Sequence, residues 1–438
     1  MAKENPKNKP IRFENAFLVT PEAVLRSDMT IRDGRIDLSA SKGGDEEVIN
    51  MEGKYVVPGF IDIHFHGYNL FEFTAGLYDA KSESFDNSWP AYENGFDRLR
   101  ETLAGFGVTD FYVGTWASEI ENLKTCYGHL HKYLSENKEG VKGARLLGGL
   151  LEGSFINPQM AGAQNPDFVL EQRRENFDAI EDKGAIKLVN AVADFGRGSC
   201  ELIEYLTSKG IVVGAGHTNA TCEQLEAAVK AGLKYFIHFT NGPTGGSYKS
   251  FNGGGAIEAV LKNDELYAEL ILDGYHVNPA YVRDILNRKG VDRILAVTDS
   301  LFVTGSALKN FVVSGIPGRV SDDGEYICVV GKPKTLCSSN LTMNRAFRNL
   351  LNWLTSEMEG IWNRNHSAMD FERALVDVSK ICSTNSAALT ALAGQGFGSI
   401  ADGAQANLCV LDIKGSAGNY RVDVDKTIVS GNIVYSRG

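Results

Sequence analysis

One short stretch, residues 56–67, combines the pattern of a buried strand with two closely spaced histidines. Residues 60–65 are mostly apolar, as in a parallel sheet that is covered on both faces, and Pro58-Gly59 marks their start. Because side chains alternate along a strand, His64 and His66 are expected to point to the same side. Two buried histidines can simply bond to backbone carbonyls, but neutral imidazole is also the commonest protein ligand for zinc-like metals. The metal-site interpretation is favoured over simple packing only if the rest of the chain supplies further ligands at strand ends.

Seven further apolar runs follow this first one, and segments with helical periodicity, such as 223–230 and 279–287, separate them. The runs are residues 109–113, 144–151, 186–192, 211–215, 235–239, 267–272 and 293–298. Alternating β and α elements predict a parallel sheet, and eight strands predict a closed (β/α)8 TIM-type barrel. We expect this α/β barrel to occupy residues 58–399.

Both ends of the chain are rich in short strand patterns separated by turn signals. In the first part they are residues 11–13, 16–19, 29–31 and 54–57, and in the last part residues 406–412 and 427–435. We therefore expect residues 1–57 and 400–438 to form one small β-sandwich domain. A hairpin insertion is predicted after Asp299, with its turn at Asp322-Asp323-Gly324, and helices are predicted near 343–355 and 371–379.

Composition narrows the class of protein. A net charge of -11 over 438 residues argues against nucleic acid or an anionic membrane surface as the main partner. The seven cysteines are scattered and contain no C-x-x-C pair, which argues against a disulfide framework and a thiolate zinc site. No apolar run reaches 18 residues, and the polar start lacks the apolar core of a signal peptide. A cytoplasmic location is expected.

Polar residues recur where the predicted strands end, which is the face where such barrels place their active sites. Five of the eight histidines lie at these strand ends, together with two carboxylates. The set is His64, His66, Glu152, His217, His238, His276 and Asp299. Histidine with carboxylate ligation suits Zn²⁺ or Fe²⁺, so the sequence predicts a metal site on this rim. The other histidines, His129, His131 and His366, are expected on the surface.

Nearly the whole chain resembles the amidohydrolase superfamily, and within it the N-acetylglucosamine-6-phosphate deacetylase family. The matching segments are PGFID at 58–62, HFHG at 64–67, LEGSF at 151–155, AGHTNA at 215–220, HFTNG at 238–242, DGYHV at 273–277, VTD at 297–299, SSNLTM at 338–343, GSIADG at 398–403 and ANL at 406–408. Glu152, where many relatives have a carbamylated lysine, is the feature that indicates the deacetylase branch.

The resemblance implies a role for each matching residue. Glu152, His217 and His238 would hold one divalent metal, Zn²⁺ or Fe²⁺. His64 and His66 would help to hold a second ion, with Glu152 able to bridge the two. Asp299 matches the catalytic acid–base group. His276 and the main chain at Asn241 and Gly242 match positions that hold the sugar, and relatives imply a homodimer.

Two positions depart from the family pattern. Gln164 precedes Asn165-Pro166 where the family usually has a histidine that contacts the substrate, and Lys249 or its neighbours replace a phosphate-binding arginine. An amide can donate a hydrogen bond but cannot transfer a proton, and lysine attracts phosphate without the bidentate fork of arginine.

The implied reaction is metal-dependent hydrolysis of the N-acetyl group of an amino-sugar phosphate, giving glucosamine 6-phosphate and acetate from N-acetylglucosamine 6-phosphate. Two alternatives are the same chemistry on an unphosphorylated or different N-acyl amino sugar or N-acyl amino acid, and a metal-free interaction protein built on an enzyme barrel.

Overall fold

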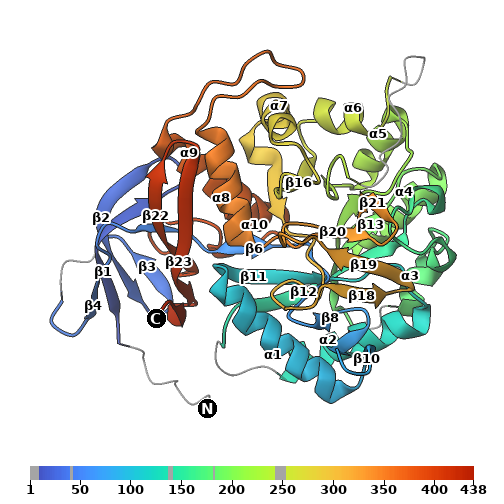
Figure 1. Cartoon of the computed structure of the whole chain (residues 1–438), viewed down its shortest axis with the longest axis horizontal. Helices are drawn as coiled ribbons and strands as arrows, with labels where there is room; N and C mark the ends of the chain where they lie inside the picture. Colours follow the sequence, from blue (N-terminus) through green and yellow to red (C-terminus); the bar gives the residue numbers. More distant parts are fainter. Residues whose placement is uncertain (1–8, 40–42, 137–141, 181–182, 242–252) are drawn as a thin grey trace.

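The chain forms a parallel barrel with a mixed, mainly antiparallel sheet at its side, as Figure 1 shows for the computed structural model. The structure describes residues 9–39, 43–136, 142–180, 183–241 and 253–438. Within these residues, no helix has the length and apolar character needed to cross a membrane. The first and last strands of the chain, blue and red in Figure 1, lie in the same side sheet.

The barrel sheet contains eight strands in the order β17-β16-β15-β14-β13-β12-β11-β6, and all neighbouring pairs are parallel. The strands are β6 (Phe60–Asp62), β11 (Val108–Gly114), β12 (Arg145–Phe155), β13 (Ile186–Ala191), β14 (Val212–Ala215), β15 (Tyr235–Phe236), β16 (Tyr267–Ile271) and β17 (Ile294–Val297). All eight predicted strands are present, and the predicted fold class is confirmed.

Two strands end three residues earlier than the sequence predicts. β6 ends at Asp62 rather than continuing to Phe65, and β15 ends at Phe236 rather than at Phe239. His64, His66 and His238 therefore lie on the segments that follow the strands.

Hydrogen bonds just beyond the strand ends join β6 to β17 and bring the barrel close to closure. Thr298 donates its hydroxyl to Oδ2 of Asp62 at 2.6 Å, and the Asp299 amide donates to the carbonyl of His64 at 2.8 Å. The His66 amide likewise donates to the carbonyl of Ser300 at 2.8 Å. The segment with His64 and His66 after β6 is therefore held beside Asp299, which follows β17.

Helices cover the barrel and follow the predicted pattern. They are α1 (Trp89–Gly105), α2 (Ile120–Glu136), α3 (Arg174–Ile180), α4 (Arg197–Ser208), α5 (Cys222–Ala231), α6 (Ala256–Lys262), α7 (Pro279–Lys289), α8 (Met343–Leu354), α9 (Phe371–Ser379) and α10 (Asn385–Leu389). Short helical turns are η1 (Pro158–Met160), η2 (Pro166–Phe168), η3 (Val291–Arg293), the π-helical η4 (Lys380–Thr384) and η5 (Ala393–Gln395).

Local sequence explains where these helices begin and which face they bury. α5 begins after Thr221, whose hydroxyl accepts the amide of Gln224 in a capping box. α8 buries Phe347, Leu350 and Leu354 at helical spacing, and each such side chain stabilises the fold by about 1.5–3 kcal/mol.

The side sheet is built from both ends of the chain in the order β24-β23-β22-β5-β1-β2-β3, with β4 paired to β1. Its strands are β1 (Ile11–Val19), β2 (Val24–Arg32), β3 (Arg35–Asp37), β4 (Glu47–Asn50), β5 (Tyr55–Pro58), β22 (Leu408–Ser416), β23 (Asn419–Val429) and β24 (Asn432–Ser436). β22 runs antiparallel to β5, with Leu408 opposite Pro58. The exact domain boundaries, at 57/58 and 399/400, stay a prediction.

The side sheet has its own core and is tied to the barrel. Phe13, Leu18, Val410 and Ile428 are among the buried residues of this core. The side chain of Asn407 donates to Oδ2 of Asp110 on β11 at 2.9 Å.

Two antiparallel insertions extend from the carboxyl ends of the first and last barrel strands. The first contains β7 (Gly67–Tyr68), β8 (Phe71–Glu72), β9 (Gly76–Asp79) and β10 (Ser84–Asp86), and the second contains β18 (Asn310–Val313), β19 (Ile316–Val320), β20 (Ile327–Val329) and β21 (Lys332–Leu336). The predicted hairpin is thus part of a four-stranded sheet. Tyr78 of the first insertion packs on Phe302, which precedes the second, with ring centroids 5.2 Å apart.

Candidate active site

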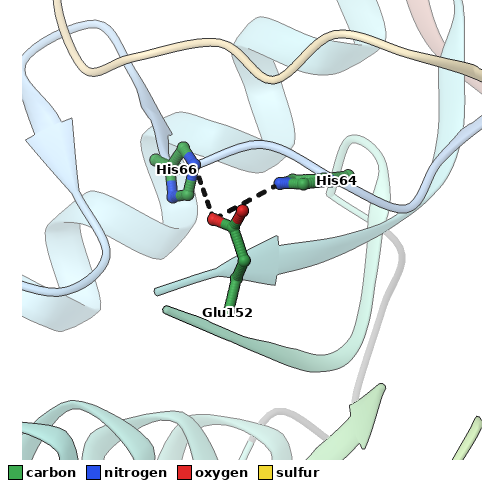
Figure 2. A group of neighbouring side chains, drawn as sticks. All are labelled: His64, His66 and Glu152. Atoms are coloured by element: carbon green, nitrogen blue, oxygen red, sulfur yellow. Dashed lines mark ion pairs between the residues drawn. The ribbon is translucent and has the colours of Figure 1, made fainter. Parts of the chain in front are cut away.

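The buried carboxylate of Glu152 on β12 lies among four imidazoles. Its Oε1 is 3.0 Å from Nε2 of His238 and 3.4 Å from Nε2 of His217. Its Oε2 is 3.5 Å from Nε2 of His66 and 3.7 Å from Nε2 of His64, and Figure 2 shows both rings directed at the carboxylate. One side chain therefore faces two groups of possible ligands, one on each oxygen.

Unusual backbone conformations direct several of these side chains into the site. His217 and His238 follow β14 and β15 with φ of 53° and 29°, and Asp299 follows β17 with φ of 48°. The left-handed region costs about 1–2 kcal/mol for a residue with a Cβ. Such conformations concentrate at functional sites, where the surrounding structure holds them in place.

Hydrogen bonds at Nδ1 set the orientation of three of the rings. Nδ1 of His64 lies 2.8 Å from Oε2 of Glu269, Nδ1 of His217 lies 2.9 Å from the Met160 carbonyl, and Nδ1 of His238 lies 3.0 Å from the Asn241 carbonyl. These oxygens only accept, so each Nδ1 is the donor and each Nε2 directs its lone pair at Glu152. Metal-binding histidines have this arrangement, because the outer hydrogen bond fixes the tautomer.

The donor set fits a divalent metal. The ligand atoms of His64, His66 and Glu152 all lie within 4.8 Å of one another, and so do those of Glu152, His217 and His238. Nε2 of His64 is buried and has no hydrogen-bond partner among the described residues. Burial alone would raise the pKa of Glu152, but hydrogen bonds from imidazoles that carry a proton on Nε2 outweigh it and hold this pKa well below its usual value. A divalent cation would take the place of those protons beside the same ionised carboxylate. An ionised carboxylate with imidazole lone pairs is a donor set for Zn²⁺ or Fe²⁺.

Asp299 lies at the boundary between this cluster and a cavity. Its side chain is 11% exposed, and its Oδ1 is 3.0 Å from Nε2 of His66. Burial would raise the pKa of Asp299, but the hydrogen bond with His66 and the nearby charge of His64 outweigh it and lower this pKa. The carboxylate is therefore ionised near neutral pH and can accept a proton.

A cavity of about 410 Å³ opens from the cluster and is large enough for a small-molecule substrate. Loops after the barrel strands line one side, and the β18–β21 sheet lines the other. Its lining residues are His66, Trp116, Glu152, Gly162, Ala163, Gln164, Asn165, His217, His238, Asn241, His276, Asp299, Leu301, Val313, Ser314, Ile316, Lys334, Thr335, Leu336, Cys337 and Ser338.

The predicted substrate-binding residues separate into two sets. Gln164, Asn241 and His276 line the cavity, whereas Gly242 and Lys249 lie outside the described residues. The amide nitrogen of Gln164 donates to Oε2 of Glu152 at 3.0 Å, and its oxygen accepts the Ala117 amide at 2.7 Å. Gln164 thus contacts the ligand cluster itself.

Sequence reasoning missed three residues of the site. Trp116 lines the cavity with its ring centroid 5.8 Å from that of His66, and Lys334 lines the opposite wall on β21. Glu269 lies inside the barrel and contacts both His64 and the amide of His238. A carboxylate inside the apolar run 267–272 was a usable signal for Glu269, whereas no local pattern marks the other two.

The remaining histidines only partly match expectation. His129 and His131 are partly exposed, but the prediction that His366 lies on the surface is wrong. His366 is buried, and its Nε2 lies 2.9 Å from Oδ1 of Asp284 on α7. The two residues are far apart in the sequence, so no local pattern predicts their contact.

Known proteins of similar sequence are deacetylases of N-acetylated amino-sugar phosphates. No family model matches the chain. The chain is 29% identical over 310 residues to the N-acetylglucosamine-6-phosphate deacetylase of Vibrio furnissii, covering 70% of this chain and 71% of that protein. It is 27% identical over 350 residues to the enzyme of the same name from Bacillus subtilis strain 168, covering 77% and 81%. It is also 27% identical over 339 residues to an N-acetylgalactosamine-6-phosphate deacetylase of Escherichia coli O157:H7, covering 76% and 82%.

Solved structures share the fold. The N-acetylglucosamine-6-phosphate deacetylase of Mycobacterium smegmatis aligns with a TM-score of 0.78 and 22% identity, covering 98% of this chain and 100% of that one. The enzyme of the same name from Thermotoga maritima aligns with a TM-score of 0.76 and 23% identity, covering the same shares. The chain is thus similar in sequence to curated N-acetylglucosamine-6-phosphate deacetylases, enzymes of the amidohydrolase superfamily, and shares the fold of solved deacetylase structures.

Proposed function

We propose that this enzyme is a metal-dependent deacetylase that converts N-acetylglucosamine 6-phosphate to glucosamine 6-phosphate and acetate. The observation that carries the proposal is the Glu152 carboxylate between two pairs of imidazoles, with Asp299 beside them at the cavity. In this proposal Glu152, His217 and His238 hold one ion, and His64 and His66 contribute to a second.

The proposed chemistry divides between the metal and the chain. A divalent ion in such a site polarises a carbonyl group and lowers the pKa of water towards about 7. Asp299 accepts the proton of the attacking water and then donates it to the departing amine, which is otherwise a poor leaving group. The position of Asp299 supports both steps, because its carboxylate lines the cavity with Oδ1 3.0 Å from Nε2 of the proposed ligand His66.

A cation at the cavity supports the phosphorylated substrate. Lys334 is the one lysine or arginine among the described residues that line the cavity, and its side chain forms no ion pair or hydrogen bond with another described residue. Glu152 and Asp299 are the acidic residues of that lining, so an anionic group would be attracted to the wall formed by β21. We assign phosphate attraction to Lys334, with Lys249 as the second candidate from the sequence.

The proposals on the metal, the oligomeric state and the cellular location rest on different grounds. The ligand types favour Zn²⁺ or Fe²⁺. A cytoplasmic homodimer acting on a small molecule is proposed from the family resemblance. Elemental analysis and sedimentation of the purified enzyme test the metal and the dimer.

The deciding experiment measures acetate release by the metal-loaded enzyme from four compounds. These are N-acetylglucosamine 6-phosphate, its galactosamine epimer and the two unphosphorylated sugars. We expect the highest kcat/KM with N-acetylglucosamine 6-phosphate. Equal or better turnover of the unphosphorylated sugars would replace the proposal with the alternative of an unphosphorylated N-acyl substrate.

A further inference from the structure

Glu269 on β16 is a fully buried carboxylate inside the barrel, beside the ligand cluster. Its Oε2 accepts two hydrogen bonds, from Nδ1 of His64 at 2.8 Å and from the backbone amide of His238 at 2.9 Å. Its Oε1 has no partner among the described residues. One oxygen therefore makes both contacts.

The two contacts act on different groups of proposed ligands. The contact with Nδ1 of His64 directs the Nε2 lone pair of that ring at Oε2 of Glu152. The contact with the His238 amide holds a backbone with φ of 29°, from which the imidazole reaches Oε1 of Glu152. A shift of Glu269 would therefore displace one ligand from each group.

A purely stabilising role explains Glu269 poorly. No lysine or arginine pairs with it among the described residues, and a buried carboxylate without a cationic partner costs several kcal/mol of desolvation. The buried hydroxyl of Tyr235 is also without a hydrogen-bond partner in the described structure. The buried polar groups of Glu269 and Tyr235 therefore lower the stability of the fold. Oε2 of Glu269, in contrast, accepts two hydrogen bonds of good geometry.

We propose that Glu269 is a positioning residue that aligns His64 and His238 for metal binding and so couples the two ligand groups. Its role depends on the reach of the carboxylate oxygen to both donors. Because both hydrogen bonds enter one oxygen, a glutamine can keep them through its amide oxygen and lose only the charge. An aspartate keeps the charge, but it is one methylene shorter and cannot reach both donors from the same backbone.

The pair Glu269→Gln and Glu269→Asp therefore separates positioning from charge. Each purified variant is stripped of metal and titrated with Zn²⁺ against a chromophoric chelator, and Co²⁺ absorption spectra report the ligand geometry. Urea unfolding of the metal-free forms measures stability. We expect Glu269→Asp to weaken metal affinity by about 10–100-fold, the usual effect of an outer-shell substitution, and to alter the Co²⁺ spectrum. Glu269→Gln should remain within a few-fold of the parent.

The chain offers a matched control in Asp284, a buried carboxylate that contacts the ring of His366 away from the cluster. Asp284→Asn should lower stability and leave metal affinity unchanged. The inference is wrong if Glu269→Gln weakens metal binding as much as Glu269→Asp, because charge would then be the essential property. It is also wrong if both variants bind metal like the parent and differ only in stability.

This inference rests on the proposed metal dependence, and the two fail in different ways. A parent enzyme that binds no Zn²⁺ or Fe²⁺ overturns the proposed function itself. A parent enzyme that binds metal tightly, with affinity insensitive to Glu269→Asp, overturns only the role of Glu269.

Discussion

Nε2 of His66 lies 3.0 Å from Oδ1 of Asp299, so a proposed metal ligand and the proposed proton acceptor are in direct contact. Asp299 is also fixed by its own backbone, whose amide donates to the carbonyl of His64. The acid–base group therefore has its position set by the same segment that supplies two ligands. Replacing its carboxylate without changing its shape should separate proton transfer from metal binding.

Asp299→Asn is nearly isosteric but cannot carry a proton. We expect metal content and KM to remain close to those of the parent, while kcat falls by roughly 10²–10⁴-fold, the usual contribution of general acid–base catalysis. Steady-state kinetics with elemental analysis of the same preparation measures both. A variant with normal metal content and kcat within a few-fold of the parent would refute the catalytic assignment.

Glu152→Gln tests the shared ligand. The amide keeps one oxygen, but its nitrogen has no lone pair for a metal and its negative charge is gone, so most bound metal should be lost. His64→Asn should cost less, because it removes a ligand from only one group. Metal stoichiometry by mass spectrometry compares the two. Full occupancy and activity in Glu152→Gln would contradict the ligand assignment.

Lys334→Ala tests anion recognition by the β18–β21 sheet. Loss of a charge-assisted hydrogen bond worth about 2 kcal/mol should lower kcat/KM for the phosphorylated sugar by roughly 30-fold, mainly through KM. The unphosphorylated sugar should be unaffected. Lys332→Ala is the matched control, since Lys332 is exposed on the same strand and does not line the cavity.

If Lys334→Ala reduces activity on both substrates equally, Lys334 does not bind phosphate. Lys249→Ala then becomes the next test, because the resemblance assigns phosphate binding to that position. A loss confined to Lys249→Ala would return the assignment to the sequence-based prediction.

Asp284→Asn tests a structural contact that the sequence did not indicate. The carboxylate accepts the amides of Ile361, Trp362 and Asn363 as well as the ring of His366. Loss of the Asp284 charge should lower the free energy of unfolding by about 2 kcal/mol at neutral pH, which is within the range for hydrogen bonds to a charged group. Urea unfolding at several pH values measures the difference.

The pH dependence of that difference has a definite sign. Burial would raise the pKa of Asp284, but its hydrogen bonds with Trp362 and His366 outweigh it and lower this pKa below the usual 3.8. A carboxylate whose pKa is lower in the folded than in the unfolded state contributes its full stabilisation at any pH above the unfolded-state pKa. That contribution is lost as the pH falls through the folded-state pKa. The parent and Asp284→Asn should therefore differ by a constant amount above about pH 5 and converge below pH 4. A difference that grows on acidification would contradict the assignment.

The barrel could be predicted because apolar runs of the parallel sheet are nearly continuous and helical periodicity separates them. The ends of the strands were less predictable. His238 and Asp299 lie on backbone with positive φ, and an alternating pattern of side chains carries no information about such a turn. The residue types at the rim were nevertheless sufficient to list every proposed ligand.

The rest of the site depends on contacts between distant segments. Lys334 reaches the cavity only because a four-stranded insertion folds over the barrel end, and the sequence indicated no more than a hairpin there. His366, which lies outside the helices, is buried because Asp284 on α7 supplies its partner. Hydrophobic patterning reports local burial and cannot identify which polar groups meet across the fold.

The pairing of β5 with β22 has a consequence for synthesis of the protein on the ribosome. β5 emerges early, but its partner begins only at Leu408, so at about 5–20 residues per second the edge of β5 stays unpaired for on the order of tens of seconds. During that time Phe13 and Leu18 also lack their packing partners Val410 and Ile428. Nascent chains, and products of premature stop codons before Leu408, would therefore present an open strand edge and apolar surface to chaperones and proteases.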